Sequence, residues 1–248
     1  MATPETTAEM PPMMYGTAWK KERTADLVYE AIKAGFRGID TAAMKRHYDE
    51  ALTGEGIPYL DALVLHSPYP TPHETLLALH TLQSYLPSSA DPSRAGQVRR
   101  LGLSNVTLPA LVEALPPPAA TGLSIVQNRF CAAEHAFDRA VRAWCAAQQQ
   151  SPVAYQGFWT LTGNRGVWDA AWFVRALADG VPGGLSRAAA WYVLVRSAGV
   201  VVLNGTGDVA HMREDQGAWE RVAAWRAGEE EGARVWERCV AGFRELVG

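Results

Sequence analysis

The stretch GFRGIDTA (residues 35–42) contains a helix-stopping glycine, a short apolar run and the acid Asp40 where that run ends. Tyr48 follows in the next loop. A carboxylate near a phenol can orient it and tune its pKa, which at about 10 is otherwise too high for easy proton donation near neutrality. Asp40 and Tyr48 are therefore a candidate catalytic pair. A strand-capping acid beside a surface tyrosine explains the same residues equally well.

The same arrangement, a polar residue at the carboxyl end of an apolar run, recurs along the chain. It is found at His66, Ser104-Asn105, Gln127-Asn128 and Tyr155. Helical periods separate the runs, which implies parallel strands joined by right-handed helical crossovers. In a (β/α) barrel the carboxyl ends of all strands converge on one mouth, where the active site lies. We therefore predict an α/β fold of the (β/α)8 TIM-barrel type.

The expected elements follow from these periods. Strands are expected over residues 14–19, 37–41, 61–66, 98–103, 124–128, 152–155 and 199–203, and helices over 72–86, 108–115, 137–149, 186–197, 209–227 and 233–247. A further helix is expected to have Thr24 as its N-cap and to stop at Gly35. The run Asp61–His66 is continuously apolar, as in a strand buried on both faces. Residues 1–12 are expected to form a disordered tail and residues 13–248 a single barrel domain.

Composition excludes several classes of function. The net charge is −3 and no basic cluster is present, which argues against a nucleic-acid partner. No apolar run approaches the roughly 18 residues that a membrane helix needs. The three cysteines are widely spaced and form no CxxC pair, so we expect reduced thiols in a cytoplasmic protein rather than a disulfide framework or a metal site. We expect a monomer that acts on a small molecule.

Five segments together resemble the aldo-keto reductases, especially fungal members. They are GTAWKKERTADLVYEAIKAGFRGIDTA (16–42), LVLHSP (63–68), VRRLGLSNVTLPAL (98–111), IVQNRF (125–130) and AYQGFW (154–159). The resemblance extends from about residue 13 to residue 225. It implies a (β/α)8 barrel that reduces the carbonyl of an aldehyde or ketone with a hydride from NADPH.

The family's catalytic residues are Asp, Tyr, Lys and His. By motif position the resemblance assigns the proton-donating tyrosine to Tyr48, the acid that tunes it to Asp40, and the substrate-orienting histidine to His66. A positioned phenol suits general acid catalysis, and an imidazole can donate to the developing oxyanion. The spacing from Asp40 to Tyr48 is longer than in most members of the family.

The resemblance also assigns cofactor-binding residues. Ser104, Asn105 and Gln127 match the positions that hydrogen-bond the nicotinamide carboxamide, and Tyr155 matches the aromatic residue that stacks on the nicotinamide. At the adenosine end the matching residues are Asn204, Thr206 and Glu214.

The adenosine end departs from the family pattern. Gly205 and His211 replace the two cations that would hold a 2′-phosphate. NADPH is the expected cofactor, but these residues do not exclude NADH.

The lysine of the catalytic set has no counterpart. In the family it ends a third strand, which precedes the LHSP strand. Here Gly54–Ile57 leads through residues 58–60 directly into Asp61–His66, although a parallel crossover needs about a dozen residues or more. We therefore expect an incomplete barrel of about seven strands. An error in the gene prediction, a degenerated paralogue or a barrel closed in another way would each explain the gap.

Lys20 and Lys45 are the candidate replacements for the missing lysine, although exposed loop charges are the commoner role of such residues. Without the lysine, the higher pKa of the phenol would weaken transition-state stabilisation. Two other function classes stay open. One is a pseudoenzyme that binds a nucleotide or a partner, and the other is a non-redox isomerase with Tyr48 and His66 as acid and base.

Overall fold

The computed structural model of the chain describes residues 10–41, 59–133 and 135–248. These residues divide into two compact units. Unit 1 combines residues 10–41 with Thr160–Leu246, and unit 2 contains residues 59–133 and 135–159. Four features of the sequence analysis lie outside the described residues, namely residues 1–9, Lys45, Tyr48 and Gly54–Ile57.

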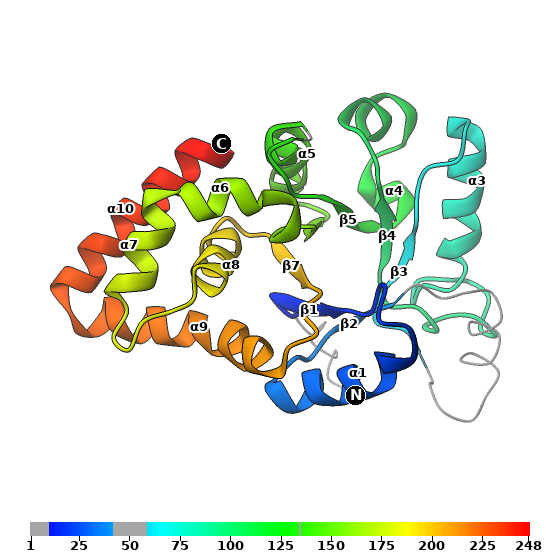
Figure 1. Cartoon of the computed structure of the whole chain (residues 1–248). Helices are drawn as coiled ribbons and strands as arrows, with labels where there is room; N and C mark the ends of the chain where they lie inside the picture. Colours follow the sequence, from blue (N-terminus) through cyan, green and yellow to red (C-terminus); the bar gives the residue numbers. More distant parts are fainter. Residues whose placement is uncertain (1–9, 42–58, 134) are drawn as a thin grey trace, which may run out of the picture. The chain divides into compact units, whose positions relative to one another are not determined.

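The fold is of the (β/α)8 TIM-barrel type in an incomplete form, as predicted. The described residues contain seven strands that alternate with helices (Figure 1), and the strand pairs within each unit are all parallel. Each predicted strand is present, with its bounds shifted by a few residues. Apolar runs of this length, separated by helical periods, are sufficient to predict the architecture.

Unit 1 contains a three-stranded segment of parallel sheet. Its strands lie in the order β2 (Ile39–Asp40), β1 (Met13–Gly16) and β7 (Val201–Asn204). Its helices are α1 (Thr24–Ala34), α6 (Arg165–Ala170), α7 (Trp172–Gly180), α8 (Arg187–Ser197), α9 (Val209–Gly228) and α10 (Glu230–Val247), with 3-10 turns at Lys21–Arg23 and Thr162–Asn164. Tyr15 on β1 lies opposite Ile39 on one side and Asn204 on the other, so it stands at the centre of this sheet.

The ends of α1 were predicted with unequal success. The prediction that Thr24 is the N-cap is wrong, because the turn Lys21–Arg23 runs directly into the helix and Thr24 already has helical backbone angles. The hydroxyl of Thr24 instead donates to the Lys21 carbonyl at 2.6 Å. The predicted stop at Gly35 is confirmed. Gly35 has φ +111° and donates its N–H to the carbonyl of Ile32, in a conformation that a Cβ atom would strain.

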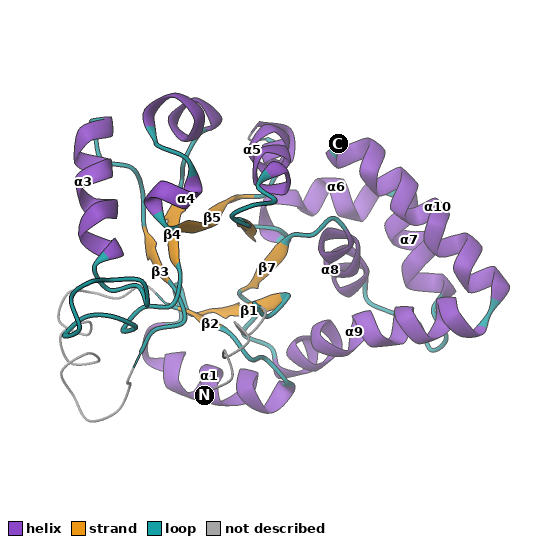
Figure 2. Cartoon of the chain, turned by 180° about the vertical axis from the view of Figure 1, so that it is seen from behind, coloured by secondary structure: helices purple, strands orange, loops and turns teal. Residues whose placement is uncertain are grey.

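Unit 2 contains a four-stranded segment of parallel sheet. Its strands lie in the order β3 (Leu63–Leu65), β4 (Leu101–Ser104), β5 (Leu123–Arg129) and β6 (Ala154–Phe158). Its helices are α3 (Pro72–Gln83), α4 (Pro118–Thr121) and α5 (His135–Ala147), with a π-helical turn at Ala110–Ala114. Figure 2 shows α3, α4 and α5 along one face of these strands. The opposite face carries the polar side chains of Ser104, Gln127 and Gln156, which are described below.

The strand at one edge of unit 2 differs from the prediction. The expectation that residues 61–66 form a strand buried on both faces is wrong, because all three residues of β3 are only half-buried. All four residues of β4 are buried. Among the described residues β3 pairs along one edge only, with β4. A continuous apolar run therefore does not by itself distinguish an interior strand from an edge strand.

Two helices of unit 1, α6 and α7, were not predicted. Ala171 precedes α7 and makes no side-chain hydrogen bond to it, so the N-cap signal that usually marks a helix start is missing. In unit 2 three prolines occupy positions 116–118. They follow the turn Ala110–Ala114, but Pro118 also begins α4, because a proline at the first helical position loses no backbone hydrogen bond.

Candidate functional site

Three polar side chains form a row across neighbouring strands of unit 2. Ser104, Gln127 and Gln156 lie on β4, β5 and β6, in register with one another. The hydroxyl of Ser104 donates to the Gln127 carbonyl at 2.6 Å, and the Nε2 of Gln127 donates to the Oε1 of Gln156 at 3.0 Å. We call these three residues the polar row. Ser104 and Gln127 were predicted to bind cofactor, whereas Gln156 was missed.

Asn105 extends the polar row beyond the end of β4. It has φ +53°, a left-handed conformation that asparagine tolerates better than most residues. Its N–H donates to the Gln127 carbonyl at 3.1 Å, and its Nδ2 donates to the His66 carbonyl at 2.8 Å. The side chain of His66 is exposed. Unit 2 therefore brings Ser104, Asn105 and Gln127 together beside the His66 backbone.

Tyr155 lies on the other face of the sheet from the polar row. Successive residues of a strand point to opposite faces, and Gln156 points with Gln127. The ring of Tyr155 is buried, and its hydroxyl is 3.4 Å from the Arg129 carbonyl, to which it donates. Burial, followed by the nearby charge of Asp138 on α5, raises the pKa of the Tyr155 phenol well above its ordinary value. The structure thus places Tyr155 between the sheet and α5.

A buried asparagine lies behind the polar row. The side-chain oxygen of Asn128 accepts from the Val106 N–H at 3.0 Å, and its Nδ2 donates to the Val106 carbonyl at 2.7 Å and to the Asp138 carboxylate at 2.8 Å. Asn128 thereby ties the segment that follows Asn105 to β5 and α5. These buried hydrogen bonds of Asn128 therefore stabilise the strand ends that carry the polar row.

Two tryptophans follow β1 and β6 closely in the sequence. Trp19 in unit 1 is 93% exposed and Trp159 in unit 2 is 50% exposed, and both have left-handed backbone angles. The Arg129 guanidinium lies over the Trp159 ring, 4.5 Å from its centroid. Arg129 is two residues beyond Gln127 on β5 and shares its face. An aromatic face and a cation therefore flank the polar row at the carboxyl ends of β5 and β6.

Asp40 stands at the carboxyl end of β2 in unit 1. It lies opposite Gly16, the last residue of β1, and its backbone carbonyl accepts from the Thr17 N–H at 2.9 Å. Its side chain is half-buried. The predicted strand end with an acid at its tip is therefore present. Its predicted partner, Tyr48, lies outside the described residues.

The loop Asn204–Asp208 joins β7 to α9. The buried side chains of Asn204 and Asp215 form a hydrogen-bonded pair that fixes this loop. Asn204 is fully buried, and its Nδ2 donates to the Asp215 carboxylate at 2.7 Å while its Oδ1 accepts from the Thr206 N–H at 2.9 Å. Burial raises the pKa of the Asp215 carboxyl to about 6, against the lowering effect of the bond from Asn204. The Thr206 hydroxyl in turn accepts from the Asp208 N–H at 3.2 Å.

Two cations from the segment between β1 and α1 reach this loop. The Lys20 ammonium donates to the Gly205 carbonyl, and the Arg23 guanidinium lies 3.5 Å from the Gly207 carbonyl. Burial, and then repulsion from Arg23, lowers the pKa of Lys20. Lys20 was predicted either to replace the missing lysine or to be a solvated loop charge. Its contact with the Gly205 loop was not predicted, because nothing local indicates a contact with a residue 185 positions away. The structure supplies positive charge where Gly205 and His211 lack it.

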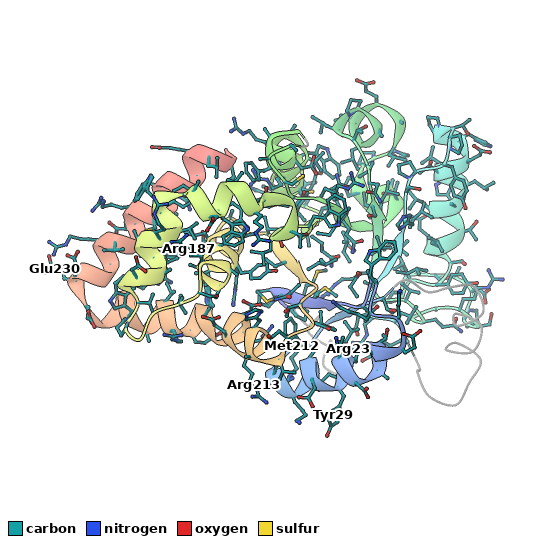
Figure 3. The ribbon with its side chains drawn as sticks, viewed as in Figure 1. Arg23, Tyr29, Arg187, Met212, Arg213 and Glu230 are labelled. Atoms are coloured by element: carbon teal, nitrogen blue, oxygen red, sulfur yellow. The ribbon has the colours of Figure 1, made fainter. Side chains whose placement is uncertain are left out.

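Two further residues near the predicted adenosine end have other surroundings. The Glu214 carboxylate accepts from the Ser186 N–H at 2.6 Å, just before α8. Arg213 is exposed and projects from α9 away from β7, whereas Arg23 lies on the segment between β1 and α1 (Figure 3). Glu214 therefore links α9 to the start of α8.

No protein-family model and no curated protein matches the chain. Solved structures do match it. The aldo/keto reductase from Brucella melitensis is 18% identical, with a TM-score of 0.64 over 85% of this chain and 90% of that one. The aldo-keto reductase from Klebsiella pneumoniae in complex with NADPH is 17% identical, with a TM-score of 0.61 over 93% and 92%. MGS-M4, an aldo-keto reductase from a Medee basin deep-sea metagenome library, is 14% identical, with a TM-score of 0.65 over 94% and 93%.

The chain has the aldo-keto reductase fold. On this fold most of the predicted residues within the described ranges stand at or near the carboxyl ends of strands, where TIM barrels hold their active sites, whereas Tyr155 is the second residue of β6 and Glu214 lies on α9. The residues at or near strand ends are Asp40 at the end of β2, His66 after β3, Ser104 at the end of β4 with Asn105 after it, Gln127 on β5, and Asn204 at the end of β7 with Thr206 after it. At identities below one fifth, the similarity establishes the fold and leaves each residue's role to its geometry.

The described parts of the chain give no support for a metal site or for a membrane-spanning helix. There, no group of His, Cys, Asp and Glu side chains is arranged to hold a metal ion. No helix in the same residues has both the length and the apolar character needed to cross a bilayer.

Proposed function

We propose that this chain is an oxidoreductase of the aldo-keto reductase type, which binds NADPH or NADH and reduces the carbonyl of an aldehyde or ketone. Its activity would be lowered by the missing lysine. The observation that carries the proposal is the convergence of Ser104, Asn105 and Gln127, whose hydroxyl and amide groups meet at the carboxyl ends of β4 and β5. The similar Klebsiella pneumoniae structure contains NADPH.

The residues of unit 2 fit the nicotinamide end of such a cofactor. A carboxamide offers two donors and one acceptor, and the amides of Asn105 and Gln127 with the Ser104 hydroxyl supply both kinds of partner. The residues of unit 1 fit a pyrophosphate. Gly205 and Gly207 leave open space where Cβ atoms would stand, and Lys20 and Arg23 bring two cations to the same loop.

The start of α9 contributes less to phosphate binding. The Asp208 carboxylate accepts from the N–H groups of Ala210 and His211, so these amides of the first turn are already engaged. Positive charge at this loop therefore depends on Lys20 and Arg23. Arg213 is exposed and projects away from β7 in Figure 3, which gives no support for a third cation at the loop.

A bound nicotinamide nucleotide supplies a hydride to the carbonyl carbon. In the proposed reaction Tyr48 donates a proton to the carbonyl oxygen, Asp40 orients the phenol, and His66 donates a hydrogen bond to the same oxygen. Ser104, Asn105 and Gln127 orient the nicotinamide ring. The half-exposed Trp159 ring, beside Arg129, offers an apolar face to the substrate.

Fluorescence titration with NADPH and NADH, followed by nucleotide oxidation with a panel of aromatic aldehydes, tests the proposal. We expect saturable binding and slow turnover. Tyr48→Phe should lower turnover by about 100-fold or more, since a general acid contributes that much. Tyr29→Phe is the matched control, because Tyr29 is an exposed tyrosine on α1.

Other outcomes separate the competing functions. Binding without turnover would identify a nucleotide-binding pseudoenzyme, which the missing lysine favours. Turnover of an enone without any nucleotide would identify an isomerase. If neither nucleotide binds, the proposed function is wrong. The cytoplasmic location, the monomeric state and the single domain over residues 13–248 stay predictions.

A further inference from the structure

The third residue of the polar row has no role in the site described so far. Gln156 is 2% exposed, although its amide is strongly polar. Buried side-chain amides require hydrogen-bond partners, and the Oε1 of Gln156 accepts from the Nε2 of Gln127 at 3.0 Å. The two residues lie directly opposite each other on β6 and β5.

This bond determines how Gln127 presents its side chain. Gln127 has one amide oxygen and one amide nitrogen at its tip, and rotation by half a turn exchanges them. Because the nitrogen donates to Gln156, the oxygen is directed to the other side, where the Ser104 hydroxyl lies 3.4 Å away. Gln127 thus offers an acceptor beside Asn105, which suits the NH2 group of a nicotinamide carboxamide.

The neighbouring residue has the opposite orientation. Tyr155, to which the sequence resemblance gives the stacking role, points to the α5 side of the sheet, where its hydroxyl donates to the Arg129 carbonyl. Residues 155 and 156 cannot both face the polar row, since adjacent strand residues alternate. The face that holds Ser104 and Gln127 receives Gln156.

We propose that Gln156 is a positioning residue for the nicotinamide end of the cofactor, acting through Gln127, and that Tyr155 takes no part in cofactor binding. The inference rests on the proposed function. Loss of the Gln156 acceptor removes a hydrogen bond that orients the Gln127 amide, so the nicotinamide has a less well oriented partner while the rest of the nucleotide keeps its contacts.

The test compares two nucleotides in each variant. NADPH carries the nicotinamide, whereas 2′,5′-ADP lacks it, and the ratio of their dissociation constants is insensitive to the fraction of protein that is folded. In Gln156→Leu we expect NADPH to bind about 5–10-fold more weakly, the loss typical of one hydrogen bond, with 2′,5′-ADP binding unchanged. Gln156→Asn, which is too short to reach Gln127, should show the same selective loss if the leucine variant fails to fold.

Two further variants complete the design. Gln156→Glu keeps an oxygen acceptor at the same distance and should restore most of the NADPH affinity. Tyr155→Leu removes the ring and should lower the thermal unfolding midpoint while leaving the ratio of the two dissociation constants unchanged. Equal weakening of both nucleotides in Gln156→Leu and Gln156→Asn, or selective loss of NADPH in Tyr155→Leu, would overturn the inference. A wild-type chain that binds neither nucleotide would instead refute the proposed function, and this inference with it.

Discussion

Asn128 in unit 2 and Asn204 in unit 1 make the same pattern of buried hydrogen bonds but fix different loops. Each asparagine is buried near the end of a strand and donates its side-chain N–H to an aspartate on the next helix, Asp138 in one case and Asp215 in the other. Each also accepts from a backbone N–H of a loop at the carboxyl end of the sheet. A short polar side chain thereby satisfies a buried carboxylate and holds a loop at the same time.

The difference lies in which loop each one holds. Asn204 accepts from Thr206, two residues further on, and so fixes its own loop. Asn128 bonds both backbone groups of Val106, 22 residues away, and so fixes the loop of a neighbouring strand. The first contact can form as soon as β7 ends, whereas the second requires β4 and β5 to be paired. The polar row therefore depends on tertiary structure more than the Gly205 loop does.

The largest effect is expected for Asn128→Ala. The substitution leaves the N–H and carbonyl of Val106 and the Asp138 carboxylate without this buried partner, at a cost of about 3 kcal/mol in the free energy of unfolding. Urea unfolding followed by tryptophan fluorescence and by circular dichroism measures it. Gln150→Ala, at an exposed position of the same unit, is the control and should change little. If the two variants had the same free energy of unfolding, the hydrogen bonds of Asn128 would not contribute to stability as predicted.

Asn204→Ala should cost less, about 2 kcal/mol, because the Thr206 N–H lies in a partly exposed loop where water can replace the lost acceptor. The same unfolding measurement applies, with the exposed Arg213→Ala as control. Hydrogen exchange at Thr206 should accelerate in Asn204→Ala and stay slow in the control. If Asn204→Ala lowered the free energy of unfolding more than Asn128→Ala does, the predicted order of the two effects would be wrong.

The carboxylate of unit 1 predicts a dependence of stability on pH. The Asp215 pKa is raised from 3.8 to about 6, so the folded state keeps its proton where the unfolded state has released it. The contribution of this group is full below pH 4 and is lost as the pH rises through about 6, by an amount on the order of 3 kcal/mol. Asp215→Asn should remove this part of the pH dependence. Unfolding curves of wild type and variant that stay parallel from pH 4 to pH 7 would contradict the raised pKa.

The smallest effect on stability is expected at the surface of the Gly205 loop. Lys20→Met should change the free energy of unfolding by less than about 1 kcal/mol, because Lys20 is only half-buried and its bond to the Gly205 carbonyl is exposed to solvent, which screens it. The same substitution should still lower the affinity for pyrophosphate-containing nucleotides several-fold. Lys21→Met is the matched control, since Lys21 is an exposed neighbour. Similar losses of nucleotide affinity in both variants would show a general effect of charge rather than a contact.

The fold and part of the site could be predicted because they depend on local signals. Gly35 ends α1 through its own left-handed backbone, and Thr71 with Glu74 forms a capping box that starts α3. The convergence of Ser104, Asn105 and Gln127 could be predicted because polar residues at the ends of apolar runs gather when parallel strands form a barrel. Thr24 was misassigned because the turn before it extends the helix start.

Other parts of the site depend on distant residues. Lys20 reaches Gly205 only after β1 has paired with β7, and the half-burial of β3 follows from its position at an edge of its sheet. Neither relation leaves a signal in the neighbouring residues.

By itself, the sequence determined the alternation of strands and helices and the presence of polar side chains at the strand ends, since both follow from short-range periodicity. It did not determine which face of β6 meets the polar row. Both Tyr155 and Gln156 satisfy the alternating pattern, and a strand shifted by one residue exchanges their faces. The tertiary structure decided between them by packing α5 against one face, where Asp138 lies near Tyr155, and by pairing Gln156 with Gln127 on the other.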